Sequence, residues 1–193
     1  LAEGTKELPI IFKKNQNEDK PWGTVAIIGK NSKNSILKNI FFEGGSGGHL
    51  NQYKFLSMFS IHNTSDIQIL NSKFSSNELF DDTIHIIYSN NILLQDIEIK
   101  NAYSDAIDID ISNDISLKNI KIQDSKNDGV DFMESNATVE NLVVINSKDK
   151  GVSIGENSNL IIKNSIFKNN KIGAAIKDRS KAKFYEVNFS NNE

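Results

Sequence analysis

Hydrophobic and polar residues alternate along most of this chain, and from Asp82 onward the alternating pattern recurs every 22 or 23 residues. Stretches such as Ile84-His85-Ile86 and Ile107-Asp108-Ile109 place apolar side chains at every second position, which is typical of β-strands with one buried face. A repeat of this length is too short for a crossover that contains a helix. We therefore expect each repeat to return directly beneath the previous one, with parallel strands stacked about 4.8 Å apart.

Apolar residues form four columns when the repeats are superposed, and their members are expected to point into a shared core. The columns contain Leu94, Leu117, Val139, Ile162 and Phe184; Ile99, Ile122, Val144, Phe167 and Phe189; Ile84, Ile107, Val130, Val152 and Ala174; and Ile86, Ile109, Phe132, Ile154 and Ile176. This pattern predicts an all-β fold, a right-handed parallel β-helix (solenoid) of about seven coils. Its regular coils contain 22–23 residues.

A polar column marks one bend of every coil, and its intervals reveal where the repeat is interrupted. It contains Asn39, Asn71, Asp96, Asn119, Asn141, Asn164 and Glu186. The two longest intervals place insertions at residues 44–53 and 76–80, and inserted loops of a solenoid often carry function. We predict a single domain over residues 1–193, irregular over 1–54 and regular over 55–193. Because the chain begins with Leu1 rather than Met, we expect it to be a fragment of a longer protein.

Composition and charge argue against several classes of function. The net charge of −3 with a single arginine, Arg179, argues against nucleic acid as a partner, because phosphate binding needs a concentrated basic surface. The absence of cysteine excludes disulfides and zinc–thiolate sites. No apolar run reaches the length of a membrane span, so membrane insertion is not expected. The middle of the chain is strongly acidic, since residues 81–134 contain twelve carboxylates and four lysines.

Stacking of the coils gathers acidic residues into two ladders. In the first, Asp82, Asp105 and Asp128 share one position at the start of a strand, and Lys150 follows in the next coil. Two interpretations of this ladder remain open. Each carboxylate caps its turn by accepting backbone N–H groups, with Lys150 neutralising one end, or the like charges bind a cation or raise one another's pKa.

The second ladder contains His85, Asp108, Asp131 and Ser153 and points outward from the sheet, with Asp110 two residues beyond Asp108 on the same side. We predict a metal site formed by Asp105, Asp108, Asp110, Asp128 and Asp131. Oxygen ligands suit Ca²⁺ or Mg²⁺ better than zinc, and Ca²⁺ is the expected ion. A solvated acidic face without an ion is the alternative, and outward histidines such as His62 and His85 are most often solvated too.

With these residues aligned, the chain resembles the pectin-lyase-like superfamily of right-handed β-helices over nearly its whole length. Four segments look like β-helix segments of large bacterial surface proteins: Lys20-Pro21-Trp22-Gly23, Gly44-Gly45-Ser46-Gly47-Gly48, Asn127-Asp128-Gly129-Val130-Asp131 and Asp149-Lys150-Gly151-Val152. Some of those proteins adjoin spore-coat-protein-H-type kinase-like domains. The resemblance implies an extracellular or cell-surface location and a polysaccharide or cell-surface glycan as partner.

The acidic face is also a candidate catalytic site, because inverting glycosidases need two carboxylates about 6.5–9.5 Å apart. The Asn-Thr-Asp-Gly-Ile-Asp motif of polygalacturonases resembles residues 127–131, but this chain has Asp149-Lys150 where that family has paired aspartates, and it lacks the family's Gly-His-Gly and Arg-x-Lys. A lyase needs a cation and a basic side chain, for which the candidates are Lys150, Lys177 and Arg179. For an enzyme of either kind we predict a catalytic set of Asp108, Asp128, Asp131 and Lys150.

Three hypotheses of function follow. The first is a rigid, Ca²⁺-stabilised module of a secreted or cell-surface protein that presents or binds carbohydrate. The second is a polysaccharide lyase, epimerase or hydrolase acting on acidic glycans at the Asp-rich face. The third is a structural assembly element, because Phe184, Val187 and Phe189 of the last coil occupy core columns without a cap and are expected to contact a further domain or the end of another molecule.

Overall fold

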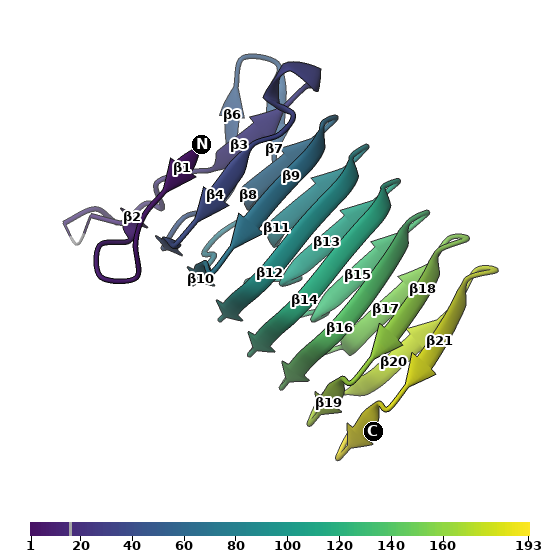
Figure 1. Ribbon diagram of the computed structural model, residues 1–193. Coiled ribbons are helices and arrows are strands. Elements are labelled where there is room, and N and C mark those ends of the chain that lie inside the picture. Colours follow the sequence, from purple (N-terminus) through teal and green to yellow (C-terminus); the bar gives the residue numbers. More distant parts are fainter. Residues whose placement is uncertain (16) are drawn as a thin grey trace.

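The structure is a parallel β-solenoid in which each coil lies beneath the previous one (Figure 1). It is a computed structural model that describes residues 1–15 and 17–193. The solenoid makes about six turns, with about 23 residues in each coil, and the predicted all-β solenoid is confirmed. In the described part of the chain the one helical segment is the short 3₁₀ turn η1 (Lys30–Ser32), so no helix there has the length and apolar character needed to cross a membrane.

Two parallel sheets form the long walls of the solenoid, as far as the described residues show. Sheet A has 13 strands. Its main path is β1 (Ala2–Glu3), β4 (Ile36–Lys38), β9 (Ser65–Leu70), β12 (Asn90–Lys100), β14 (Asn113–Gln123), β16 (Asn136–Ile145), β18 (Asn159–Lys163) and β21 (Lys181–Tyr185). Its other strands are β2 (Ile10–Lys13), β5 (Ile40–Glu43), β10 (Lys73–Ser75), β19 (Ile166–Lys168) and β22 (Asn188–Ser190).

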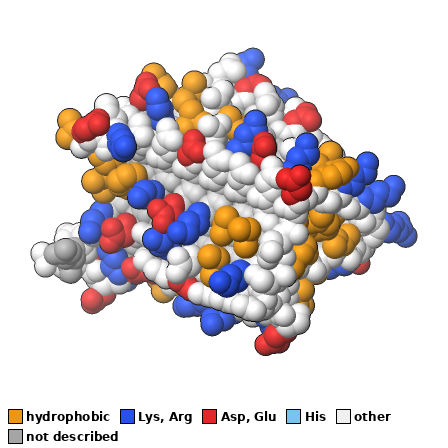
Figure 2. All heavy atoms as spheres, turned by 60° about the horizontal axis from the view of Figure 1, so that its bottom comes forward, with side chains coloured by type: hydrophobic (Ala, Val, Ile, Leu, Met, Phe, Trp, Pro, Cys, Tyr) orange, Lys and Arg blue, Asp and Glu red, His pale blue; other side chains and the backbone are white. Residues whose placement is uncertain are grey.

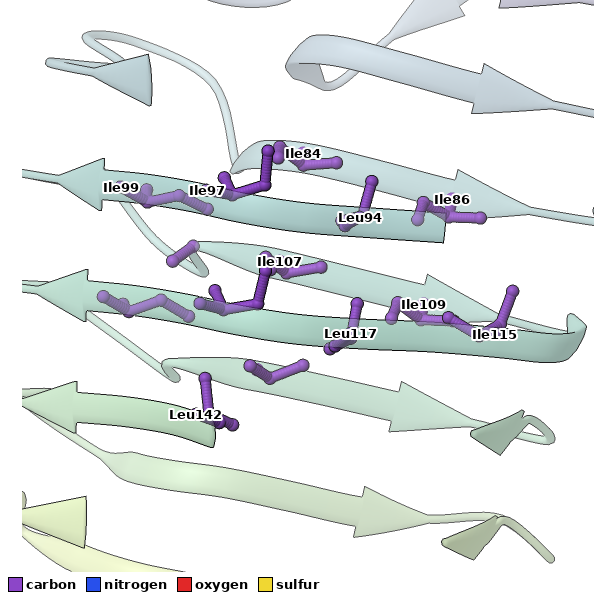
Figure 3. Close-up of a cluster of buried hydrophobic side chains, with 14 of the residues drawn as sticks. Ile84, Ile86, Leu94, Ile97, Ile99, Ile107, Ile109, Ile115, Leu117 and Leu142 are labelled. Atoms are coloured by element: carbon purple, nitrogen blue, oxygen red, sulfur yellow. The ribbon is translucent and has the colours of Figure 1, made fainter. Parts of the chain in front are cut away.

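Sheet B faces sheet A across the core and has one strand in each coil. Its seven strands are β3 (Val25–Ile28), β8 (Ser57–His62), β11 (Asp82–Ile87), β13 (Ile107–Asp110), β15 (Val130–Met133), β17 (Lys150–Gly155) and β20 (Ile172–Ile176). Side chains of Ile84 and Ile86 on sheet B point toward those of Leu94 and Ile97 on sheet A (Figure 3). All members of the four predicted columns before the last coil are fully buried, so the core prediction is confirmed for these coils.

The last coil departs from the predicted core. Ile176 is 47% exposed and Phe189 is 46% exposed, while Ala174 and Phe184 are half-buried. These residues keep their places in the columns, because Ile154 pairs with Ile176 and Phe167 pairs with Phe189. They are exposed because a coil packs against them on one side only.

The predicted polar column marks a bend at which the backbone adopts left-handed torsion angles. All seven residues, from Asn39 to Glu186, have φ between 47° and 57°. Asparagine tolerates this conformation better than most residues, which explains its recurrence at the bend. The side chains also bond from coil to coil, since Asn119 donates from Nδ2 to Oδ1 of Asp96 and Asn141 donates to Oδ1 of Asn119, each at 2.8 Å.

The two predicted insertions form loops beside sheet B. In the first, β6 (Gly48–Leu50) and β7 (Tyr53–Phe55) make an antiparallel hairpin, and the buried ring of Phe55 lies 5.5 Å from that of His62 on β8. The second immediately precedes β11 and is held by Asn77, whose Nδ2 donates to the carbonyls of residues 80, 81 and 82 at 2.7, 3.2 and 2.9 Å. The second loop therefore adjoins β11, which begins both acidic ladders, and the hairpin adjoins β8, the strand that pairs with β11.

Candidate functional site

The outer face of sheet B carries the second predicted ladder. Backbone pairing aligns His85 with Asp108, Asp108 with Asp131 and Asp131 with Ser153, so the predicted register is confirmed. Asp110 ends β13 two positions beyond Asp108. Because side chains alternate along a strand and Ile109 between them points into the core, both aspartates project outward.

Three side chains converge on this face, which we call the His85 cluster: His85, Asp108 and Asp110. The Nε2 atom of His85 lies 3.4 Å from Oδ2 of Asp110 and 3.8 Å from Oδ2 of Asp108. One ligand atom from each residue lies within 4.8 Å of the others, so together they could hold a metal ion. The side chains of His85, Asp108 and Asp110 are 12%, 21% and 16% exposed, so the cluster is largely shielded from solvent.

Burial and mutual repulsion favour protonated carboxyl groups in this region. Burial, together with the neighbouring charges of Asp110 and Asp131, raises the pKa of Asp108 to about 8. Burial, aided by the charge of Asp108, raises the pKa of Asp82 to about 10. For Asp105, burial is again the main cause and raises the pKa to about 7. Folding therefore brings several carboxyl groups together at a cost in electrostatic energy.

The first ladder lies at the start of the same strands and makes the contacts expected of turn caps. Asp105 Oδ1 accepts the backbone N–H of Asp128 at 2.7 Å, and Asp128 Oδ1 accepts that of Lys150 at 2.8 Å. The Nζ of Lys150 also lies 3.3 Å from both Asp128 oxygens and 2.5 Å from Oδ2 of Asp149. The ladder is buried, with Asp82, Asp105 and Asp128 only 3%, 8% and 2% exposed. The roles of Asp105 and Asp128 as metal ligands or catalysts stay predictions.

Asp131 lies between the His85 cluster and a buried hydroxyl group. Its register partner Ser153 is fully buried, and Ser153 Oγ has no hydrogen-bond partner among the described residues.

The two additional basic candidates, Lys177 and Arg179, lie in different places. The side chain of Lys177 folds over Gly155, since Cε of Lys177 lies 3.0 Å from the position that a Cβ atom on Gly155 would occupy. Arg179 is exposed in the bend after β20. Of the two additional basic candidates, Lys177 therefore lies on the ladder side of sheet B.

Two histidines make a contact that the sequence did not predict. The rings of His62 and His85 meet edge to face, with centroids 4.9 Å apart. Neither is simply solvated, because His62 Nε2 and His85 Nδ1 are buried and have no hydrogen-bond partner in the described part of the chain. Burial, with the nearby charge of His85, lowers the pKa of His62 to about 4. The available signal was the nearly matching position of the two histidines in adjacent coils, next to an insertion.

A hollow lined by residues of sheet A lies away from these side chains. Its volume is about 1080 Å³, and it follows the bend at Asn39, Asn71 and Asp96 on sheet A. The His85 cluster lies on sheet B and is organised by side-chain convergence. This arrangement suits the binding of a small ion, and a nitrogen beside two carboxylates is equally suited to moving a proton.

Known proteins share this fold. The family model for the right handed beta helix region matches residues 57–193, whereas no curated protein matches the sequence. The periplasmic alginate epimerase AlgG is similar in structure, with a TM-score of 0.54 and 10% identity over 85% of this chain and 48% of that one. A mutant of AlgG gives a TM-score of 0.59 and 12% identity over 80% and 45% of the two chains. PfbA, a surface adhesin of Streptococcus pneumoniae, gives a TM-score of 0.25 and 8% identity over 79% and 44%, too low to support an argument.

These likenesses concern the fold alone. The identities of 10% and 12% are too low to transfer a catalytic residue or a ligand. The chain also spans less than half of the length of AlgG.

Proposed function

The chain belongs to the right-handed β-helix family, and from that premise we propose that it is a rigid, non-catalytic module of a secreted or cell-surface protein that binds carbohydrate. In this proposal a divalent cation held by His85, Asp108 and Asp110 stabilises the coils. The structural similarity to a periplasmic protein supports a location outside the cytoplasm.

The observation that supports the cation is the convergence of one nitrogen and two carboxylate oxygens within 4.8 Å. His85 belongs to β11, whereas Asp108 and Asp110 belong to β13, so an ion bound here would join two neighbouring coils. The two carboxylates repel each other, and a cation between them replaces that repulsion with attraction. Because the unfolded chain cannot hold the three groups together, the ion would stabilise the folded state.

The ligand set bears on the choice of ion. The oxygen-only set predicted from the sequence favours Ca²⁺. With His85 included, one imidazole and two carboxylates remain, a combination that suits Mn²⁺ or Zn²⁺ better than Ca²⁺. We therefore propose a transition-metal ion, with Ca²⁺ as the comparison.

Thermal melting tests whether a divalent cation binds at the His85 cluster. The protein is stripped with EDTA and melted alone and with excess Mn²⁺, Zn²⁺ or Ca²⁺. A ligand at 100 times its dissociation constant adds about 2.7 kcal/mol, so we expect the melting temperature to rise by about 5 °C or more. Asp108→Asn and Asp110→Asn should each abolish the rise, while Asp114→Asn, an exposed aspartate on β14, should keep it. The same melting curve with and without each ion would refute the proposed site.

A polysaccharide-modifying enzyme is the second candidate, supported by the direct pairing of Asp108 with both His85 and Asp131. These groups can donate and accept protons on one face, and AlgG, with the same fold, is an epimerase. The test is incubation with alginate, pectin and chondroitin, followed by detection of unsaturated ends, reducing ends and changed uronate configuration. Activity that disappears in Asp131→Ala would favour the enzyme. If none of the three polysaccharides gives a product, the binding module remains as the proposed function.

A further inference from the structure

A second site with binding chemistry lies away from the His85 cluster, where β12, β14 and β16 end. A hollow of about 570 Å³ opens there between the loop at residues 76–79 and the bends after these strands, a volume typical of small-ligand sites. We call it the Tyr103 hollow. The side chains that line it include Asn77, Tyr103, Ser125, Lys126 and Lys148. We propose that it binds a uronate unit of an acidic polysaccharide, an inference that rests on the proposed carbohydrate-binding function and names its site.

Two lysines supply the positive charge. The backbone N–H of Lys126 donates to the carbonyl of residue 102, and that of Lys148 to the carbonyl of residue 125, so the two lysines come from consecutive coils. Both are exposed, and no ion pair of either occurs among the described residues. Figure 2 shows the side on which these strands end, where basic and acidic side chains border a pale band of uncharged polar groups and backbone.

The acidic residues of the hollow are already engaged. Glu78 Oε2 lies 2.6 Å from Nζ of Lys14. Asp124 Oδ1 accepts a hydrogen bond from Nδ2 of Asn146 at 2.9 Å. Lys14 compensates the charge of Glu78, whereas Asp124 keeps its charge because Asn146 is neutral. The hollow therefore carries the two charges of Lys126 and Lys148 against the single charge of Asp124, and this excess favours an anionic ligand.

Tyr103 gives the hollow an aromatic surface. Its side chain is 42% exposed, and Lys126 Nζ lies 4.6 Å from the ring centroid. The ring holds the ammonium group near the hollow by a cation–π contact. An aromatic ring beside a cation suits a sugar acid, because the apolar C–H face of the sugar packs on the ring while its carboxylate reaches the lysine.

Two buried polar atoms of the hollow have unused hydrogen-bonding capacity. Asn77 is 4% exposed and Ser125 is 1% exposed, and both line the hollow. Asn77 Oδ1 and Ser125 Oγ have no hydrogen-bond partner in the described part of the chain. Such groups are rare because they lose their bonds to water without replacement. A small rotation of either side chain toward the hollow would let a hydroxyl-rich ligand supply the missing partner.

The coil repeat extends this site along the rod. Lys171 follows Lys148 in the next coil, since its backbone N–H donates to the carbonyl of residue 147. Successive lysines therefore advance along the solenoid by about one strand spacing, about 4.8 Å. Lys171 Nζ already lies 3.8 Å from Oδ1 of Asp149, so in the described part of the chain Lys126 and Lys148 are the two members of this row without an ion pair. A polysaccharide lying parallel to the solenoid axis would pass both of them.

Isothermal titration calorimetry with hexamers of galacturonate and guluronate tests the site, with cellohexaose as the neutral comparison and inorganic phosphate as the simple anion. We expect a uronate hexamer to bind and the two comparisons to bind at least tenfold more weakly. The double variant Lys126→Gln/Lys148→Gln should weaken uronate binding at least tenfold. The matched control is Lys163→Gln/Lys183→Gln, exposed lysines on β18 and β21, which should bind like the parent. Circular dichroism melts establish that every variant is folded.

The outcomes separate this inference from the cation proposal. Failure of both uronates to bind, equal weakening by the control pair, or phosphate binding as tight as that of the hexamer would overturn the Tyr103 hollow as a uronate site. None of these results would alter the metal-dependent rise in melting temperature. Conversely, Asp108→Asn should lose that rise and keep uronate binding. Uronate binding abolished by Asp108→Asn but kept by the lysine double variant would place the glycan at the His85 cluster and refute the inference.

Discussion

Lys150 and Asp128 form a two-point contact between adjacent coils: the backbone N–H of Lys150 donates to Asp128 Oδ1 at 2.8 Å, and its Nζ lies 3.3 Å from both carboxylate oxygens. The Asp128 side chain is 3% exposed, so the lysine is the cation that compensates a buried charge. The sequence predicts both residues as members of a catalytic set. In the structure, each of them is already engaged by the other.

Removal of the lysine should therefore destabilise the fold. We expect Lys150→Ala to lower the free energy of unfolding by about 1–3 kcal/mol, because it leaves a buried carboxylate without its counter-charge. Addition of Asp128→Asn should restore part of the loss, since the uncompensated charge disappears. Urea denaturation measures both, with Lys163→Ala as the exposed control. Equal stability of Lys150→Ala and the control would contradict the contact's structural role.

Neighbouring isoleucines on β18 allow a test of the core. Ile162 is fully buried and Ile161 is 38% exposed, although they share one strand. Ile162→Ala should lower the free energy of unfolding by about 2–5 kcal/mol, because it removes apolar contact and leaves a cavity. Ile161→Ala should cost less than about 1 kcal/mol. Similar losses of stability at both positions would contradict the burial of one face of this strand and the exposure of the other.

Ile111 stores backbone strain next to the His85 cluster. It follows Asp110 and has φ of 44°, a left-handed conformation that is unfavourable for a β-branched residue. Asn63 occupies the same kind of bend with φ of 53°. Ile111→Asn should therefore raise the free energy of unfolding by about 1 kcal/mol in urea denaturation. Ile161→Asn, at a strand position, should give no such gain. A loss of stability in Ile111→Asn would show that the isoleucine side chain contributes more than the strain costs.

Stability should fall as pH rises from 5 to 8 when no metal is present. The pKa of Asp82 is about 10 and that of Asp105 about 7 in the folded state, against 3.8 for an ordinary aspartate. The folded protein therefore binds more protons than the unfolded chain above about pH 4, and its stability is lost as pH rises toward the folded-state values. We expect a loss of more than about 1 kcal/mol, measured by urea denaturation in EDTA. Asp82→Asn should flatten the pH dependence and Asp114→Asn should not. Stability that increases from pH 5 to pH 8 would contradict the raised pKa values.

The coil register could be read from the sequence because the fold repeats its constraints. A bend that needs left-handed torsion angles recurs in every coil, and Asn119 and Asn141 each supply a residue that tolerates them. Two-residue alternation on either side of the bend then fixes which side chains enter the core. The same register predicts that His85, Asp108 and Asp131 are neighbours, and the strand pairing confirms it.

The environment of the candidate site could not be read in the same way. The hairpin that brings Phe55 against His62, and the loop fixed by Asn77, belong to the insertions, which the repeat does not specify. Loop folding depends on tertiary contacts rather than on a column of equivalent residues. The sequence consequently favoured a solvated histidine and left a solvated acidic face as an alternative, whereas His62 Nε2 is buried and the side chains of Asp108 and Asp110 are 21% and 16% exposed.

The pairing of β11 with β13 also has a consequence for how such chemistry could arise and change. The His85 cluster belongs to neither coil alone; it exists where one coil meets the next. Duplication of a single coil would create a new junction with a new combination of outward side chains, while the core columns would continue undisturbed. In a molecule of this kind, one duplication can both lengthen the solenoid and create a new site.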